Sequence, residues 1–271
     1  KRKFNTKWIA DFRDPWTDID FYHKLRLTKW ADNKHRKLEK QVLLNADHVV
    51  TVSPGCAADL EKIANRKIEV INNGFDPLDY QFELPPLDKP FSITHFGAFN
   101  KDRNPSLLWE VLGEIAEKDA EFKQKLCIRL IGQTDESVIS DIRKNGLNEN
   151  IEIHDHLPHS EGLYKLSQSQ VLLLPLNDAP NAKGILPGKM YEYIALRRLI
   201  LALGPADADY SVILNETKAG IPVSFRDKTE IKRAVLFYYS LYKEGKLIVE
   251  PGAYEKYSRR NLAEKFMKLA E

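Results

Sequence analysis

The sequence has few of the residues that build disulfide-stabilised or metal-stabilised folds. Two cysteines in 271 residues, Cys56 and Cys127, provide neither a disulfide framework nor the paired spacing of a zinc site. We therefore expect a reducing, cytoplasmic setting and two small buried thiols. No apolar run approaches the roughly 20 residues of a membrane-spanning helix. These absences argue against a disulfide-rich secreted domain and against a chain that crosses the bilayer.

Three common catalytic fingerprints are also missing. The chain has no Gly-x-Ser-x-Gly nucleophile elbow, no Gly-x4-Gly-Lys-Ser/Thr phosphate loop and no Gly-x-Gly-x-x-Gly dinucleotide motif. Hydrolase, P-loop ATPase and Rossmann dehydrogenase functions therefore lose their main support. The sequence also starts without Met, at Lys1, and enters an apolar stretch by Trp8, so we expect it to be the later part of a longer protein.

The composition that remains is that of a soluble globular protein long enough for two domains, with 43% apolar and 30% charged residues. A net charge of +2 does not imply nucleic acid, yet residues 1–40 carry twelve Lys or Arg against six Asp or Glu. Within that region, residues 21–40 read as a basic helical segment. Two interpretations stay open: a solvated outer face, or contact with anionic lipid headgroups or a phosphorylated acceptor.

Short apolar runs alternate with helical patterns along the chain. Strands are predicted at residues 8–12, 48–53, 68–71, 91–96, 126–131, 151–153, 171–174, 199–203 and 221–223. Helices are predicted at 55–64, 105–118, 136–145, 159–169, 188–195, 227–243 and 254–269, with one or two more within 21–46. This alternation predicts an α/β fold with doubly wound parallel sheets.

The loop that leads into a helix at residues 184–195 carries the clearest chemistry. Gly184 and Gly188 permit close backbone approach, and the free N–H groups of a helix start attract anions. Lys189 adds a positive charge, and Glu192, one turn on, can accept two hydroxyl hydrogen bonds. A phosphate site beside a diol site indicates a nucleotide. The alternative, an ordinary helix packed on a sheet with both charges solvated, stays open.

Two further strand ends carry charges. The strand at 8–12 runs into Arg13 and Asp14, and the strand at 91–96 runs into Gly97 and then Arg103. Ligands of open α/β sheets bind beyond the carboxyl ends of the strands, so we expect these residues in a crevice, with Arg103 on a phosphate. Plain turns, in which each arginine pairs with a neighbouring aspartate, are the alternative.

Three histidines and an aspartate gather within residues 154–159. Such a cluster raises the question of a metal, but neighbouring residues of a loop point to opposite sides and no second cluster exists. We therefore expect a polar loop beside the crevice and no metal.

In combination, these residues resemble glycosyltransferases of family 4, which have the GT-B fold: two Rossmann-like domains that face a cleft. The resemblance covers nearly the whole chain. In the family, a glycine turn with an Arg and a following Lys holds the donor diphosphate. Gly97 and Arg103 match the glycine and the Lys, whereas Ala98 stands where Arg is usual. The phosphate contact is therefore expected from Arg103 and backbone amides.

The family's Glu-x7-Glu element is half present. Glu192 matches the second Glu, which binds the donor ribose, while Gly184 stands at the first, which lies near the sugar hydroxyls. The resemblance implies that Lys189 and the amides of Leu186 and Gly188 help to stabilise the leaving diphosphate.

The first charged strand end also departs from the family. Arg13 stands where many members have a His, so Arg13 and Asp14 are expected near the donor sugar and the acceptor hydroxyl. The implied organisation is a GT-B-like pair of Rossmann-like domains, with the N-terminal one incomplete. It comprises an acceptor-side part at 1–76, a linker at 77–90, a nucleotide-sugar domain at 91–253, and a C-terminal helix at 254–271 that packs back toward the first part.

By this resemblance the chain moves a hexosyl group from a nucleotide-diphosphate sugar to a glycan or glycolipid acceptor, with retention and without a metal or cofactor. It would act in the cytoplasm, at the inner face of the membrane if residues 21–40 contact lipid, and no nucleic acid partner is expected. Two alternatives stay open: a nucleotide-sugar 2-epimerase of the same fold, and a non-catalytic module that binds sugar nucleotides.

Overall fold

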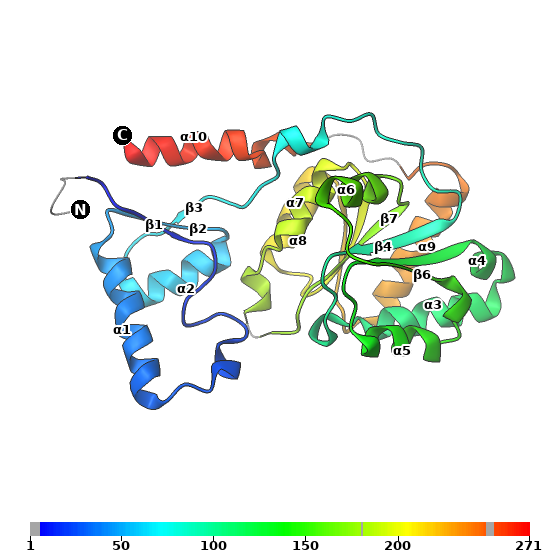
Figure 1. The fold of residues 1–271 in the computed structure, drawn as a ribbon, viewed down its shortest axis with the longest axis horizontal. Coiled ribbons are helices and arrows are strands. Elements are labelled where there is room, and N and C mark those ends of the chain that lie inside the picture. The colour runs from blue at the N-terminus through cyan, green and yellow to red at the C-terminus, as the bar shows by residue number, and fades with distance from the viewer. Residues whose placement is uncertain (1–5, 180, 248–251) are drawn as a thin grey trace.

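A computed structural model describes residues 6–179, 181–247 and 252–271. Two parallel sheets lie side by side in it, each covered by helices (Figure 1). The first sheet, with the order β1-β2-β3, consists of β1 (Ile9–Phe12), β2 (His48–Thr51) and β3 (Glu69–Val70). The second, with the order β6-β5-β4-β7-β8-β9, consists of β4 (Phe91–Phe96), β5 (Leu126–Ile131), β6 (Ile151–His154), β7 (Val171–Pro175), β8 (Leu199–Leu203) and β9 (Gly220–Val223). The predicted α/β class with parallel sheets is confirmed.

The first sheet and its helices form what we call the N-terminal unit. A short 3-10 turn, η1 (Tyr22–Leu25), precedes α1 (Lys29–Asn45), and α2 (Pro54–Ala64) follows β2. The α2 helix begins where it does because the Ser53 hydroxyl accepts a hydrogen bond from the Cys56 N–H and Pro54 suits the first helical position. Apolar side chains of both helices pack on β1 and β2 around Leu43, Val49 and Leu60.

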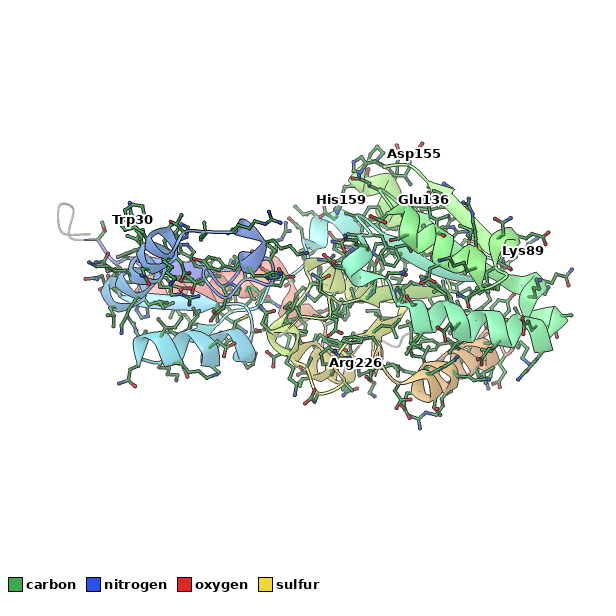
Figure 2. The ribbon with its side chains drawn as sticks, turned by 90° about the horizontal axis from the view of Figure 1, so that it is seen from below. Trp30, Lys89, Glu136, Asp155, His159 and Arg226 are labelled. Carbon is green, nitrogen blue, oxygen red and sulfur yellow. The ribbon has the colours of Figure 1, made fainter. Side chains whose placement is uncertain are left out.

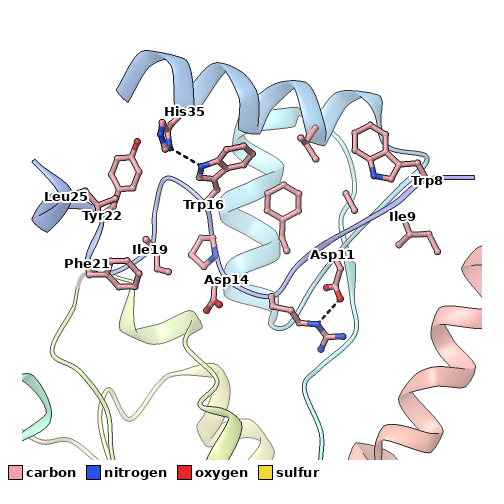
Figure 3. Close-up of a pocket in the computed structure, with 15 residues that line it drawn as sticks. Trp8, Ile9, Asp11, Asp14, Trp16, Ile19, Phe21, Tyr22, Leu25 and His35 are labelled. Carbon is pink, nitrogen blue, oxygen red and sulfur yellow. Dashed lines mark hydrogen bonds and ion pairs between the residues drawn. The ribbon is translucent and has the colours of Figure 1, made fainter. Parts of the chain in front are cut away.

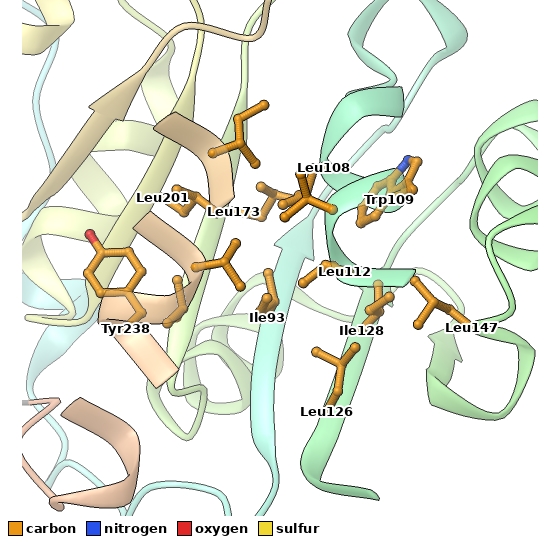
Figure 4. Packing of buried hydrophobic residues seen from close by; sticks show 14 of the residues in the cluster. Ile93, Leu108, Trp109, Leu112, Leu126, Ile128, Leu147, Leu173, Leu201 and Tyr238 are labelled. Atoms are coloured by element: carbon orange, nitrogen blue, oxygen red, sulfur yellow. The ribbon is translucent and has the colours of Figure 1, made fainter. Parts of the chain in front are cut away.

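The second sheet and the helices that cover both its faces form the C-terminal unit. One face is covered by α3 (Ser106–Lys118), α4 (Ala120–Lys125), α5 (Glu136–Lys144) and α9 (Lys228–Lys243), around the buried cluster of Figure 4. The other face is covered by α6 (His159–Ser167), α7 (Gly188–Ala195) and α8 (Asp209–Thr217). Successive strands depart from β4 in opposite directions, toward β5 and toward β7, so a topological switch point lies between β4 and β7.

The chain crosses between the two units twice. After β3 it passes through η2 (Pro77–Tyr80), and it returns through η6 (Glu255–Tyr257) to α10 (Arg259–Ala270). The crossings touch, because the Phe75 N–H donates to the Tyr257 carbonyl (3.2 Å) and the Arg259 N–H donates to the Phe75 carbonyl (2.8 Å). Leu262 of α10 is buried with β-sheet residues of the N-terminal unit. The last helix therefore packs on the first sheet, while the domain boundaries themselves stay predictions.

The described helices differ in length and polarity, but none of them is both long and apolar enough to span a bilayer.

Candidate functional site

Two adjoining cavities occupy the region where the units meet. The larger, 950 Å³, lies beyond the carboxyl ends of β4 and β7 and is closed on the opposite side by the loop that follows β1. The smaller, 710 Å³, lies beside α10 and shares Arg13, Asn73 and Gly188 with the larger. Together they are lined by seven of the predicted site residues: Arg13, Asp14, Arg103, Gly184, Leu186, Gly188 and Glu192. Gly97 and Lys189 line neither cavity.

The α7 helix points its N-terminus at the cavities. Pro187 occupies the cap position and offers no side-chain hydrogen bond, and nothing lies within 4 Å of where a Cβ of Gly188 would be. Behind this open end, Met190 and Tyr193 are fully buried against the second sheet. The helix is thus both packed, as the plain interpretation predicted, and open to a ligand at its first turn, where N–H groups and the helix dipole favour an anion.

Glu192 lies one turn further along α7, in the smaller cavity. Its Oε1 is 3.1 Å from the Nε2 of His159, the first residue of α6. This contact fixes one carboxylate oxygen from a neighbouring helix and leaves Glu192 partly exposed to the cavity. A carboxylate held in this way can accept hydrogen bonds from hydroxyl groups of a ligand.

The ammonium of Lys189, a residue that lines neither cavity, lies at the end of β4. The Nζ donates to the Phe96 carbonyl (2.8 Å) and lies 3.2 Å from the His95 Nε2. The pKa of Lys189 is lowered to about 8, mainly by burial and also by the nearby charge of Arg103, while the charge of Glu192 acts to raise it. Gly97 follows with a φ of +91°, a conformation suited to glycine, and its position brings the backbone turn close to this ammonium.

Arg103 reaches across the cleft floor instead of pairing with a neighbouring aspartate. Its Nε donates to Asn177 Oδ1 (2.8 Å), and Asn177 Nδ2 donates to Asp20 Oδ2 (2.7 Å) of the N-terminal unit. Asp102 pairs with Lys24 (2.8 Å), also in the N-terminal unit. The alternative in which Arg103 pairs with Asp102 is therefore wrong, and the glycine turn after β4 instead joins the two units.

Arg13 and Asp14 follow β1 and line the larger cavity. Figure 3 shows Asp11 and Asp14 of this segment, which also lines a neighbouring pocket of the N-terminal unit. Arg13 forms the local ion pair with Asp11 (2.8 Å) that the turn interpretation predicted. It also donates to Asn73 Oδ1 (2.6 Å), in the segment after β3, and lies over the Phe266 ring of α10. Arg13 therefore links three segments around the smaller cavity, while Asp14 is exposed and lines the larger cavity.

The histidine cluster does not form a metal site in the described part of the chain, where no three His, Cys, Asp or Glu side chains are placed to hold an ion. His154 instead pairs with Glu152 of its own strand. His159 faces the cavity, as a polar loop beside a crevice implies.

Known proteins resemble this chain in sequence and in fold. The family model described as Glycosyltransferase Family 4 matches residues 4–77. This match spans the whole first sheet, β1 to β3, and confirms the family that the sequence resembles. No curated protein matches the chain.

Solved structures extend the likeness to the second sheet. A sucrose-phosphate synthase from Thermosynechococcus elongatus has a TM-score of 0.68 at 17% identity, over 99% of this chain and 68% of that one. A glycosyltransferase from Rickettsia africae has a TM-score of 0.69 at 17% identity, over 99% and 77%. A TarM variant from S. aureus, in complex with Fondaparinux, alpha-GlcNAc-glycerol and UDP, has a TM-score of 0.62 at 14% identity, over 88% and 46%.

These likenesses establish the GT-B fold, and with the family segment they confirm the predicted class, a glycosyltransferase. The chain spans between 46% and 77% of the lengths of these three proteins.

The fold of this glycosyltransferase explains its departure from the family at Gly184. The Gly184 carbonyl accepts a hydrogen bond from the Ser53 hydroxyl (2.6 Å), and a Cβ on Gly184 would lie 3.1 Å from the backbone nitrogen of Cys56. A Cβ on Gly55 would in turn lie 2.8 Å from the Gly184 Cα. Two glycines thus let α2 approach the loop before α7, and any side chain at 184 requires the backbone of Gly55 and Cys56 to move back by a few tenths of an ångström.

Several residues of this site were not predicted from the sequence. Ser53 and Gly55 come from α2, and the Gly55 N–H donates to Asp209 Oδ2 (2.7 Å) at the start of α8. The Ser-Pro-Gly start of α2 was a visible signal of an open helix N-terminus, but its carboxylate partner is 154 residues away. His95 and Asn177 were missed because each sits inside or just after an apolar run, where the local pattern says only "strand".

Proposed function

We propose that this glycosyltransferase moves a hexosyl group from a nucleotide-diphosphate sugar to a glycan or glycolipid acceptor, with retention and without a metal ion. The observation that carries the proposal is the cleft at the switch point of the second sheet. There the open N-terminus of α7 and Glu192 of the same helix come together with Arg103 from the turn after β4. Anion-binding groups next to a hydroxyl-binding carboxylate suit a nucleotide diphosphate.

The donor would lie across the two cavities. Glu192, oriented by His159, would accept hydrogen bonds from the ribose hydroxyls in the smaller cavity. The diphosphate would lie at the N-terminus of α7, near the amides of Leu186 and Gly188 and near Arg103. Negative charge grows on the diphosphate as the glycosidic bond breaks, so these preorganised positive groups, with Lys189, would stabilise the transition state. They would take the place of the divalent cation that other transferases use.

The sugar and the acceptor would lie on the side of the N-terminal unit. Arg13 and Asp14, which follow β1, line the larger cavity on that side. Gly184 offers no side chain to the sugar hydroxyls, so those contacts would come from backbone groups and from the N-terminal unit. The TarM structure, whose bound molecules include UDP and alpha-GlcNAc-glycerol, supports the proposal, because a protein of this fold there holds a nucleoside diphosphate and a glycoside.

Sugar transfer by the purified protein, detected by mass spectrometry after a thermal-shift screen of nucleotide sugars, tests the proposal. A donor that binds the native state raises the melting temperature and names the base and sugar. Transfer that is lost in Glu192→Ala and kept in Glu136→Ala, an exposed glutamate of α5, is the expected result. Sugar isomerisation in the absence of an acceptor would favour the 2-epimerase, and nucleotide binding without transfer or donor hydrolysis would favour the binding module.

A contact with the inner face of the membrane is the remaining part of the proposal. Trp30 is 72% exposed at the outer surface of the N-terminal unit, away from the cleft (Figure 2), and Lys34 lies over its ring. An exposed indole beside basic residues suits an interface with anionic headgroups. Co-sedimentation with vesicles of phosphatidylglycerol, but not of phosphatidylcholine, is expected, and Trp30→Ser together with Lys34→Ser should weaken it. Equal sedimentation with both vesicles would rule out a charge-dependent contact.

A further inference from the structure

His95 holds a buried position directly behind the proposed diphosphate site. It is the fifth residue of β4, fully buried, with its ring stacked on Phe99 at a centroid distance of 4.0 Å. Its Nε2 lies 3.2 Å from the Lys189 Nζ, whereas its Nδ1 has no hydrogen-bond partner within the described structure. A buried imidazole that leaves one nitrogen unsatisfied costs free energy, so its presence calls for a reason.

The protonation of His95 is fixed by its surroundings. Burial holds its pKa well below the usual value, and the charges of Lys189 and Arg103 lower it further. The ring is therefore neutral at physiological pH. Because Nε2 faces an ammonium, which only donates hydrogen bonds, Nε2 is the acceptor and the proton is on Nδ1.

Two acceptors of β4 thus determine where the ammonium of Lys189 points. An ammonium has three N–H groups. One donates to the Phe96 carbonyl at 2.8 Å and a second faces His95 at 3.2 Å, so the direction of the third is set by the first two. The other charged groups that act on Lys189 are Arg103, from the turn after β4, and Glu192, one turn along α7.

We propose that His95 is a positioning residue, which together with the Phe96 carbonyl orients the Lys189 ammonium so that its remaining N–H is directed to the donor diphosphate. This inference rests on the proposed donor site. It assigns a role in the site to a residue that lines neither cavity, and it explains why a polar ring occupies a strand position otherwise suited to an apolar side chain. A purely structural His95 would need only the stacking on Phe99.

Lysine 13Cε NMR tests the first half of the proposal without any ligand. The Lys189 signal is assigned by its absence from Lys189→Met, and its titration midpoint is compared in the wild type, His95→Gln and His95→Phe. Gln retains a side-chain acceptor, whereas Phe retains only the ring. We expect a lower midpoint in His95→Phe, because a buried ammonium that loses an acceptor is less stable, and a midpoint near that of the wild type in His95→Gln. The same midpoint in all three proteins would overturn the proposal.

Calorimetry with UDP, GDP and ADP at pH 7.5 tests the second half. For whichever of these the wild type binds most tightly, we expect a five- to twentyfold weaker affinity in His95→Phe and a change of less than threefold in His95→Gln. Equal weakening in both variants would show that His95 acts only through packing, which contradicts the proposal. If the wild type binds none of the three, the donor site itself is refuted, and the NMR midpoints still decide whether His95 holds Lys189.

Discussion

The ammonium of Lys189 is buried, and burial of a charge lowers the stability of the folded protein. This free-energy cost can be measured. Its pKa of about 8 lies below the 10.5 of an exposed lysine, mainly because of burial. Between these two values the folded protein has released the proton while the unfolded chain still binds it. Stability therefore rises with pH across this window, by on the order of 3 kcal/mol at most.

Urea unfolding of the wild type and Lys189→Met from pH 7.5 to 10.5 measures this effect. We expect the wild type to gain stability relative to the variant as pH rises through 8 and to keep the gain up to about 10.5. The comparison with the variant cancels the contributions of other titrating groups. Parallel stability curves for the two proteins would show that Lys189 is not desolvated.

At Gly184 the expected effect is steric. A Cβ there would meet the backbone of Gly55 and Cys56 at 3.3 and 3.1 Å, and backbone yields less readily than a side chain. Gly184→Ala should therefore lower stability by about 1 to 3 kcal/mol. Gly188→Ala is the matched control, because a Cβ there meets nothing within 4 Å, and its melting temperature should stay close to that of the wild type. Equal melting temperatures for both variants would remove the steric reason for glycine at 184.

Among the elements, the strands of the second sheet were the most predictable. The bounds of β4, β5 and β8 agree with the sequence prediction, since each is a continuous run that packs on both faces and stops at a turn residue. The α4 and α8 helices were not predicted. The α4 helix follows α3 after a single residue, Asp119, which ends one helix and caps the next, and α8 begins after Ala208 without a side-chain cap. The start of α8 therefore carries no capping signal, and the Asp119 cap of α4 falls where the sequence shows no break from α3.

A contact between the N-terminus of α2 and the first residue of α8 joins the two units. The N-terminus of α2 receives the Asp209 carboxylate, with the Gly55 N–H donating at 2.7 Å. Asp209→Ala should leave that N–H without its acceptor and weaken the contact by about 1 to 2 kcal/mol. Hydrogen exchange at the amides of Gly55 and Cys56 should become several-fold faster. Asp207→Ala, which removes only an exposed pair with Lys183, is the control, and unchanged exchange in Asp209→Ala would contradict the role of this contact.

At the scale of the whole molecule, the sequence predicted which strand ends would line the cleft. It did not predict which contacts the side chains there would make. Charges after a strand can be read from the chain, because the carboxyl ends of parallel strands share one edge of a sheet. The orientation of Lys189 toward His95 depends on a packing direction that spacing does not encode. Gly55 and Gly184 are far apart in sequence and lie in different units. Their close contact therefore could not be predicted from any local pattern.

The proposed function requires a nucleotide to bind between the two units. Calorimetric titration of UDP, GDP and ADP into the wild type, Glu192→Ala and Glu136→Ala tests this most directly. We predict that the wild type and Glu136→Ala bind the same nucleotide with the same affinity, and that Glu192→Ala binds it at least tenfold more weakly, because the ribose hydroxyls lose their acceptor. Undiminished binding by Glu192→Ala, or the absence of binding by the wild type, would contradict the proposed site.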